Sequence, residues 1–192
     1  MTHPGGAASV ALLSITFHSK ARHLAGPFSF QETKHMSASL IFDIAPVGSL
    51  VAYSDGQPKP RARFTKKLAA WKSRNGVGRL VRKTPGRERS NYTAPPSFTL
   101  HEGDFGEGVI ILTVMRSYGI DSDLRFRVIE RPQVGQVRVL QDVGENVELL
   151  HLAESREAAE LWMARKGYSR ARLEEITADE VGAEAIDGRA AA

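Results

Sequence analysis

Residues 57–87 read QPKPRARFTKKLAAWKSRNGVGRLVRKTPGR, a stretch with eleven Lys and Arg residues and no Asp or Glu. Phe64, Leu68 and Trp71 lie at positions i, i+4 and i+7, which is the spacing of an amphipathic helix. We place this helix at residues 62–75. Apolar side chains at this spacing predict that Phe64 and Trp71 pack on the core, in preference to serving as stacking platforms for bases.

The charge of this predicted helix is unusual because it is of one sign only. Surface helices commonly place Glu four residues from Lys, which offsets repulsion by about 0.2–0.5 kcal/mol per pair, but this helix has no acid. Cations near its start also oppose the helix macrodipole. An external polyanion would compensate for the stability lost in this way.

Gly76 is expected to end the helix, and residues 78–83 (GRLVRK) then alternate as a strand does, up to the turn Thr84-Pro85-Gly86. Helix and strand together predict one continuous basic face within a basic segment that we define as residues 57–89. The side chains expected to contact phosphates are Lys59, Arg61, Arg63, Lys66, Lys67, Lys72, Arg74, Arg79, Arg82 and Lys83.

The favoured hypothesis is therefore a non-enzymatic protein that binds DNA or RNA through phosphates. Each Lys or Arg that neutralises a phosphate releases counterions, which makes such binding steeply salt-dependent. No base-reading motif is visible, so we expect no sequence specificity. Three alternatives stay open at this point: an acidic protein surface or an anionic lipid as the ligand, an enzyme without a short linear signature, and a charged surface kept for solubility.

The chain has 192 residues, 42% of them hydrophobic, which is enough for one domain with a core. It has no cysteine, and this excludes disulfides, thiolate metal sites and thiol nucleophiles. The apolar runs 8–15 and 109–115 are shorter than the roughly 20 residues that a bilayer-spanning helix needs. We expect a soluble, cytoplasmic protein.

The net charge of +4 is unevenly distributed along the chain. Residues 36–92 carry an excess of basic side chains, whereas residues 93–192 carry an excess of acidic ones. This asymmetry suits polyanion binding, but it equally suits self-association in which the basic face of one copy meets residues 154–192 of another.

The two ends differ from the rest in composition. Residues 1–35 have Glu32 as their only acid and no clear periodicity. A secretory signal, an organellar transit peptide and a dispensable extension ahead of a start at Met36 are the alternatives, and we expect the last, with these residues disordered. Residues 179–192 are expected to form a second disordered tail, leaving one domain at 36–178.

The remaining pattern predicts an α+β fold with a mainly antiparallel sheet of about seven to nine short strands and two principal helices. The second helix is placed at residues 155–166, with Ser155 or Glu154 as its N-cap and Gly167 as its stop. Residues 39–44 and 49–53 are interpreted as a hairpin, and residues 87–97 as a polar connection. Further strands are expected at 98–101, 109–116, 124–130, 137–141, 147–152 and 171–176.

No motif predicts a catalytic residue, a metal or a cofactor. His101, Glu102, Asp104 and Glu107 lack the ligand spacing of a calcium loop and are interpreted as an exposed turn. The sequence Asp121-Ser122-Asp123 is likewise interpreted as a turn, and no G-x-S-x-G elbow is present. A pocket that joined His101 or His151 to carboxylates of perturbed pKa would favour the enzyme alternative.

Overall fold

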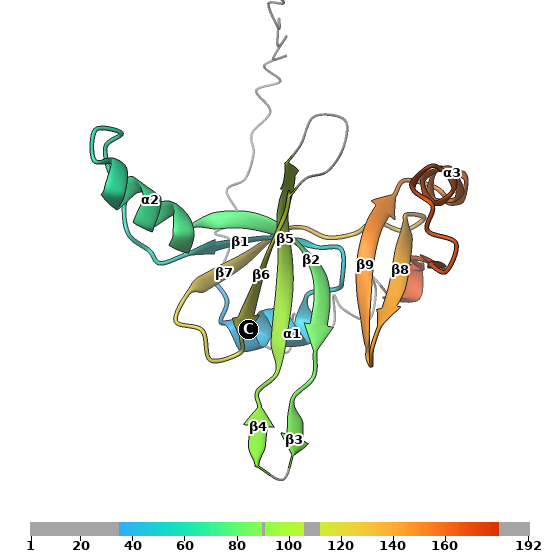
Figure 1. Ribbon diagram of the computed structural model, residues 1–192, viewed down its shortest axis with the longest axis horizontal. Helices are drawn as coiled ribbons and strands as arrows, with labels where there is room; N and C mark the ends of the chain where they lie inside the picture. Colours follow the sequence, from blue (N-terminus) through green and yellow to red (C-terminus); the bar gives the residue numbers. More distant parts are fainter. Residues whose placement is uncertain (1–34, 90, 106–111, 181–192) are drawn as a thin grey trace, which may run out of the picture. The chain divides into compact units, whose positions relative to one another are not determined.

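The computed structural model describes residues 35–89, 91–105 and 112–180, and these form ten strands and three helices (Figure 1). The prediction of an α+β fold with mainly antiparallel strands is confirmed. The predicted tails, 1–35 and 179–192, lie almost entirely outside the described residues, as does Glu107. None of the described helices combines the length and the apolar character that crossing a bilayer requires.

The strands form three sheets where we had expected one. The five-stranded sheet has the order β6-β5-β2-β1-β7 and consists of β1 (Leu50–Ser54), β2 (Gly76–Thr84), β5 (Ser97–Phe105), β6 (Leu112–Gly119) and β7 (Arg125–Glu130). The three-stranded sheet has the order β10-β8-β9 and consists of β8 (Val137–Val143), β9 (Asn146–Ala153) and β10 (Arg172–Glu175). Every pairing between these strands is antiparallel.

The hairpin predicted to begin at residues 39–44 is wrong, because these residues form helix α1 (Ala38–Ile44). The Ser37 side chain caps the helix by accepting a hydrogen bond from the Leu40 N–H. Ala38, Ile41 and Ala45 follow at helical spacing and are fully buried against the five-stranded sheet. A short apolar run fits a strand and a helix equally well, and burial on one helical face decided between them here.

Strand β2 connects the two larger sheets because both of its faces are buried. Leu80 packs in the core between α1 and the five-stranded sheet, together with Phe98 and Phe126. Val81 packs instead against Leu140 and Leu149 of the three-stranded sheet. The register between β2 and β5 shifts between Leu80 and Arg82, so the bulge at Val81 accompanies this change of partner.

Helix α3 (Arg156–Lys166) covers the three-stranded sheet, as the sequence predicted for residues 155–166. Ser155 caps its N-terminus, and Gly167 ends it in the left-handed region with φ of 76°. Ala159 is fully buried against Val137, Val139 and Ala153 of the sheet.

The polar connection predicted at residues 87–97 contains strand structure, so that prediction was wrong in detail. Strands β3 (Arg87–Arg89) and β4 (Tyr92–Ala94) pair with each other and extend the β2–β5 hairpin (Figure 1). The turn expected at residues 121–123 is present between β6 and β7, where the Ser122 N–H donates to the Gly119 carbonyl.

Candidate nucleic-acid interface and an adjoining cleft

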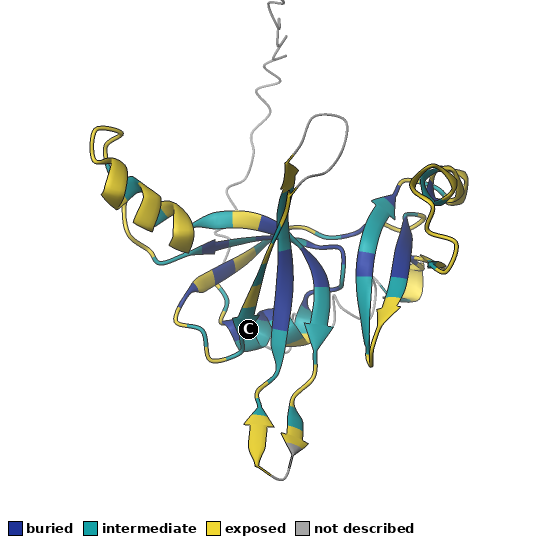
Figure 2. Cartoon of the chain, viewed as in Figure 1, coloured by how far each residue is buried: buried dark blue, intermediate teal, exposed yellow. Residues whose placement is uncertain are grey.

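Helix α2 (Thr65–Arg74) forms within the predicted range of 62–75, but it does not dock on the core as we had expected. None of its ten residues is buried, and Figure 2 shows it almost wholly exposed. Phe64, which precedes the helix, is 42% exposed. The apolar positions have helical spacing but are too few to compete with the solvation of their charged neighbours. We call residues 57–74 the basic arm.

Polar contacts at its C-terminal end hold the basic arm in place. The Asn75 side-chain amide donates to the Asp55 carboxylate at 2.9 Å and to the Trp71 carbonyl at 2.9 Å. Arg74 forms ion pairs with Asp123 at 2.6 Å and with Asp55 at 3.7 Å. The backbone and side-chain hydrogen bonds that Asp55 accepts, chiefly from Gln57, lower the pKa of its carboxyl group. These contacts orient the helix without burying it.

The other six cations of the basic arm lie in a different environment from Arg74. Within the described residues, no carboxylate comes within ion-pair distance of Lys59, Arg61, Arg63, Lys66, Lys67 or Lys72. Three of them instead lie over aromatic rings. Lys59 Nζ is 5.9 Å from the centroid of Trp71, while Arg63 Cζ and Lys67 Nζ are 4.7 Å and 5.6 Å from that of Phe64.

The N-terminus of α2 adds to this positive potential. Phe64 occupies the N-cap position, so no side chain caps the first backbone N–H groups, and the first turn contains no acid. Both the uncapped N–H groups and the neighbouring Lys66 and Lys67 side chains contribute positive electrostatic potential. An anion at this end of the helix would be attracted by both.

The three predicted phosphate-contacting residues on β2 do not share the environment of the basic arm. Arg82 forms an ion pair with Glu148 of β9 at 3.0 Å, and Lys83 lies 5.8 Å from the centroid of the Phe42 ring. The Arg79 Nη1 group donates to the Gly48 carbonyl at 2.6 Å. The predicted basic face is thus divided: six cations that lack a carboxylate partner among the described residues lie on the arm, whereas on β2 Arg82 is paired with Glu148 and Arg79 donates to a backbone carbonyl.

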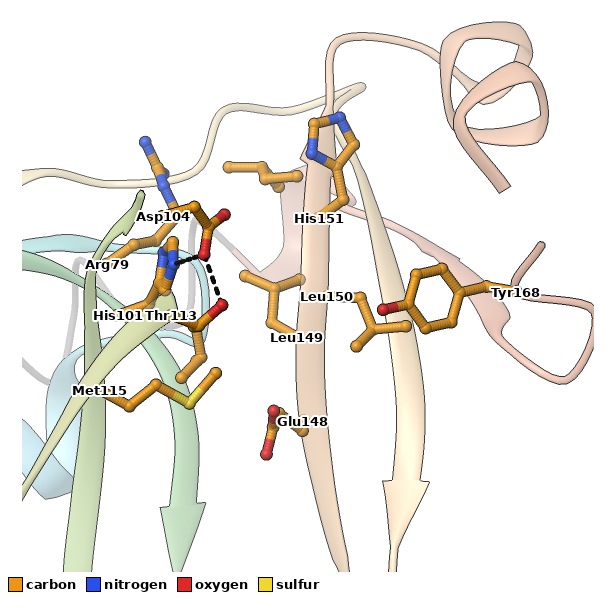
Figure 3. A pocket seen from close by; sticks show the side chains of 12 residues that line it. Arg79, His101, Asp104, Thr113, Met115, Glu148, Leu149, Leu150, His151 and Tyr168 are labelled. Carbon is orange, nitrogen blue, oxygen red and sulfur yellow. Dashed lines mark hydrogen bonds and ion pairs between the residues drawn. The ribbon is translucent and has the colours of Figure 1, made fainter. Parts of the chain in front are cut away.

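Arg79 lines a cleft of about 470 Å³ between strands β2, β5 and β6 on one side and β9 on the other (Figure 3). Across the sheet, Arg79 lies opposite His101, and His101 lies opposite Met115. These three side chains therefore share the face that borders the cleft. The strand predicted at 98–101 ended at His101, where an exposed turn was expected to begin, whereas β5 continues to Phe105.

A β-bulge brings Asp104 to the same face as His101. Residues three apart on a regular strand point to opposite faces, but the register between β5 and β6 shifts between His101 and Gly103, so Asp104 lies opposite Thr113. The Asp104 Oδ1 atom lies 3.0 Å from His101 Nε2 and accepts a hydrogen bond from the Thr113 hydroxyl at 2.8 Å. These two contacts, that with His101 first, lower the pKa of the Asp104 carboxyl group.

The opposite side of the cleft contains His151, whose ring is stacked on Trp162 with the centroids 4.8 Å apart and the planes at 2°. Trp162 is in turn stacked on Tyr168 at 5.3 Å. Burial, and secondarily the positive charge of Arg79, lower the pKa of His151. His151 is therefore a neutral ring at pH 7.

The described residues contain no group of three or more His, Asp or Glu side chains arranged to hold a metal ion. In the sequence, His101 and Asp104 were considered together as members of one loop, and His151 was considered separately from them. Thr113, Met115 and Tyr168 were missed altogether, because nothing in their local sequence marks them. Only the pairing of β5 with β6 and the position of β9 bring these side chains to one cleft.

Comparison with known proteins gives one result. A family model described as Uncharacterised conserved protein UCP036055 matches residues 36–180. No curated protein and no solved structure matches the chain significantly.

Proposed function

The chain belongs to the family described as Uncharacterised conserved protein UCP036055, and we propose that it binds nucleic acid without sequence specificity through the basic arm. The observation that carries this proposal is a helix that buries no residue and has no acid. Little apolar burial stabilises this helix, and its positive charges repel one another. A bound polyanion would offset this repulsion and so stabilise the helix.

The six arm cations that lack a carboxylate partner in the described part of the chain are the expected phosphate contacts. If each neutralises one phosphate, the logarithm of the binding constant should fall with the logarithm of the salt concentration, with a slope of about −5 for duplex DNA and about −4 for single strands. Arg74 already has two carboxylate partners, so it is expected to position the helix more than to bind phosphate.

The aromatic rings of the arm favour single strands over duplexes. Phe64 is exposed and Trp71 is partly so, and unpaired bases stack on such rings at about 1–3 kcal/mol per base. Bases inside a duplex are not available for this contact. The Trp71 indole donates its N–H to the Gln57 carbonyl at 2.8 Å, which fixes the orientation of the ring.

The test is binding of the full chain to fluorescein-labelled single-stranded and duplex oligonucleotides, measured by fluorescence anisotropy across a salt series. The variant Arg63→Glu/Lys66→Glu/Lys67→Glu reverses three arm charges. We expect it to lose most of the affinity at about 150 mM salt and to flatten the slope by about 3. A charge-matched control, Arg165→Glu/Lys166→Glu/Arg170→Glu, changes exposed cations in and after α3 and should bind nearly as the wild type does.

Equal losses in the two triple variants would show that only net charge matters, and the arm would then not be the binding site. Absence of wild-type binding at about 150 mM salt would rule out the nucleic-acid proposal. The acidic-protein alternative would then be tested by sedimentation at increasing protein concentration, since self-association needs no added polymer.

A further inference from the structure

The cleft beside β9 has the size of a small-molecule site and does not involve the basic arm. Its volume of about 470 Å³ lies within the range of roughly 300–1,000 Å³ that ligand pockets occupy. Its walls come from two sheets, with Arg79, His101 and Met115 on one side and Leu149 on the other (Figure 3).

Arg79 is a half-buried cation in this cleft, and no carboxylate of the described residues lies within ion-pair distance of it. Its Nη1 atom donates to the Gly48 carbonyl, which fixes the guanidinium group but leaves its charge uncompensated. The guanidinium retains further N–H groups for a ligand. An uncompensated charge that is partly withdrawn from water attracts an anion more strongly than an exposed one does.

The two carboxylates that line the cleft already have partners. Glu148 is paired with Arg82 at 3.0 Å, and Asp104 accepts hydrogen bonds from His101 and Thr113. The described lining thus offers a ligand one cation, Arg79, and it also includes the ring of His151.

The rest of the lining is mainly apolar. Met115 is 43% exposed on the β6 side, and Leu149, Leu150 and Leu152 line the β9 side. Tyr168 also lines the cleft, and its ring ends the stack with Trp162 and His151. Such a lining suits a ligand with an apolar body, and an aromatic ring in particular finds both aliphatic and aromatic surfaces.

We propose that this cleft binds a small organic carboxylate, whose carboxylate group pairs with Arg79 and whose apolar body lies against Met115 and Leu149. The planar guanidinium matches a carboxylate in a two-point geometry. A phosphate monoester carries nearly two charges and would meet a single cation while facing Asp104 and Glu148. The charge balance of the lining therefore selects a monoanion.

The test uses the full chain and three matched probes, 2-naphthoate, its neutral analogue 2-naphthamide, and 2-naphthyl phosphate, with octanoate as a flexible carboxylate. Isothermal titration gives the affinities. A Kd near or below about 1 mM is expected for 2-naphthoate, from a typical binding energy per atom for about 13 non-hydrogen atoms. The amide and the phosphate should bind at least about tenfold more weakly.

The variant Arg79→Gln should weaken 2-naphthoate binding at least about tenfold, because it removes a charge-assisted hydrogen bond. Arg79→Lys keeps the charge but loses the planar guanidinium group, so its affinity for 2-naphthoate should lie between those of the wild type and Arg79→Gln. Arg125→Gln is the matched control, because Arg125 is an exposed residue on β7, at the far edge of the sheet from the cleft.

Amide chemical shifts of the wild-type chain locate the probe without relying on any variant. Shifts at His101, Met115 and Leu150 that leave residues 65–74 unchanged would place it in the cleft and support the proposal. Shifts confined to the basic arm, equal affinities for wild type and Arg79→Gln, or failure of both carboxylates to bind would overturn it. Tighter binding of the phosphate than of 2-naphthoate would overturn the choice of a carboxylate. None of these outcomes bears on nucleic-acid binding by the arm.

Discussion

Tyr53 connects the core of the five-stranded sheet to its surface charges. Its ring is buried beside Tyr118, and its hydroxyl donates to Glu102, which also pairs with Arg116 at 3.0 Å. A Cβ atom at position 76 would lie 2.5 Å from the Tyr53 hydroxyl oxygen, so only Gly76 leaves room for this hydroxyl. Burial first, and the hydrogen bond to Glu102 second, raise the pKa of Tyr53 above its usual value of about 10.

This raised pKa predicts how stability changes in alkali. Below about pH 10 Tyr53 is protonated in both the folded and the unfolded chain, so it contributes no pH dependence there. Above about pH 10 only the unfolded chain loses the proton, and stability falls by up to about 1.4 kcal/mol per pH unit for this one group. Tyr53→Phe should make the fall shallower, as measured by urea unfolding between about pH 8 and pH 11.5.

Tyr92→Phe serves as the control, because it removes the same hydroxyl from a ring that is 66% exposed. Tyr118 also has a raised pKa through burial, so part of the slope should remain in Tyr53→Phe. Identical slopes in wild type and Tyr53→Phe would contradict the assignment.

At the scale of elements, α2 and α3 are helices of similar length with different support. Helix α3 buries Ala159 and packs Trp162 and Met163 on the three-stranded sheet. Helix α2 buries nothing, and the contacts that the described residues make with it lie near its C-terminal end, through Asn75, Arg74 and the hydrogen bond from Arg116 to the Ser73 carbonyl. An isolated helix of ten residues is marginal in water, so α2 depends on those polar contacts.

We therefore expect the amide hydrogens of α2 to exchange at least about tenfold faster than those of α3, because local opening of α2 exposes little apolar surface. Hydrogen exchange followed by NMR measures this directly. Adding a single-stranded oligonucleotide should slow exchange in α2 and leave α3 unchanged, which ties the element to the proposed function. Equal protection of the two helices in the free chain would mean that α2 has tertiary support beyond these polar contacts.

For the molecule as a whole, Arg138 links segments that are far apart in the sequence. It lies on β8 and is buried, donating to the Val47 carbonyl between α1 and β1 at 2.9 Å. It also pairs with Glu174 of β10 at 3.1 Å and with Glu180. Beside it, Val81 of β2 packs on Leu140 and Leu149. The three-stranded sheet is thus joined to the rest by this apolar cluster, by the ion pair between Arg82 and Glu148, and by the buried Arg138.

Replacing this cation should be costly. Arg138→Met leaves two carboxylates without their partner and the Val47 carbonyl without its donor, and we expect a loss of about 2–4 kcal/mol in the free energy of unfolding. Urea denaturation followed by circular dichroism measures it. The control is Arg172→Met on the neighbouring strand, whose exposed pair with Asp142 at 3.9 Å should be worth less than about 1 kcal/mol. A loss for Arg138→Met no greater than that of the control would show that the buried cation does not join the sheets.

Local patterns in the sequence were enough to predict many of the elements. Ser155 and Gly167 bound α3 as predicted, because caps and stops act within a few residues of one another. The excess of basic residues at 57–87 was equally visible, since charge needs no fold to be counted. Residues 38–44 were misinterpreted because a seven-residue apolar run carries no clear period, and burial against the sheet made it a helix.

What the sequence determined by itself is the α+β class, the antiparallel strands, the caps of α3 and the concentration of basic charge, all of which depend on neighbouring residues. Only the tertiary structure decided that α2 lies outside the core, that Arg79 and Arg82 leave the basic face, and that His101 joins Asp104. The bulge in β5 reverses which side chains share a face, and contacts such as that between Arg82 and Glu148 connect residues 66 positions apart. Such distant contacts follow from how the strands pair and pack, and no local period encodes them.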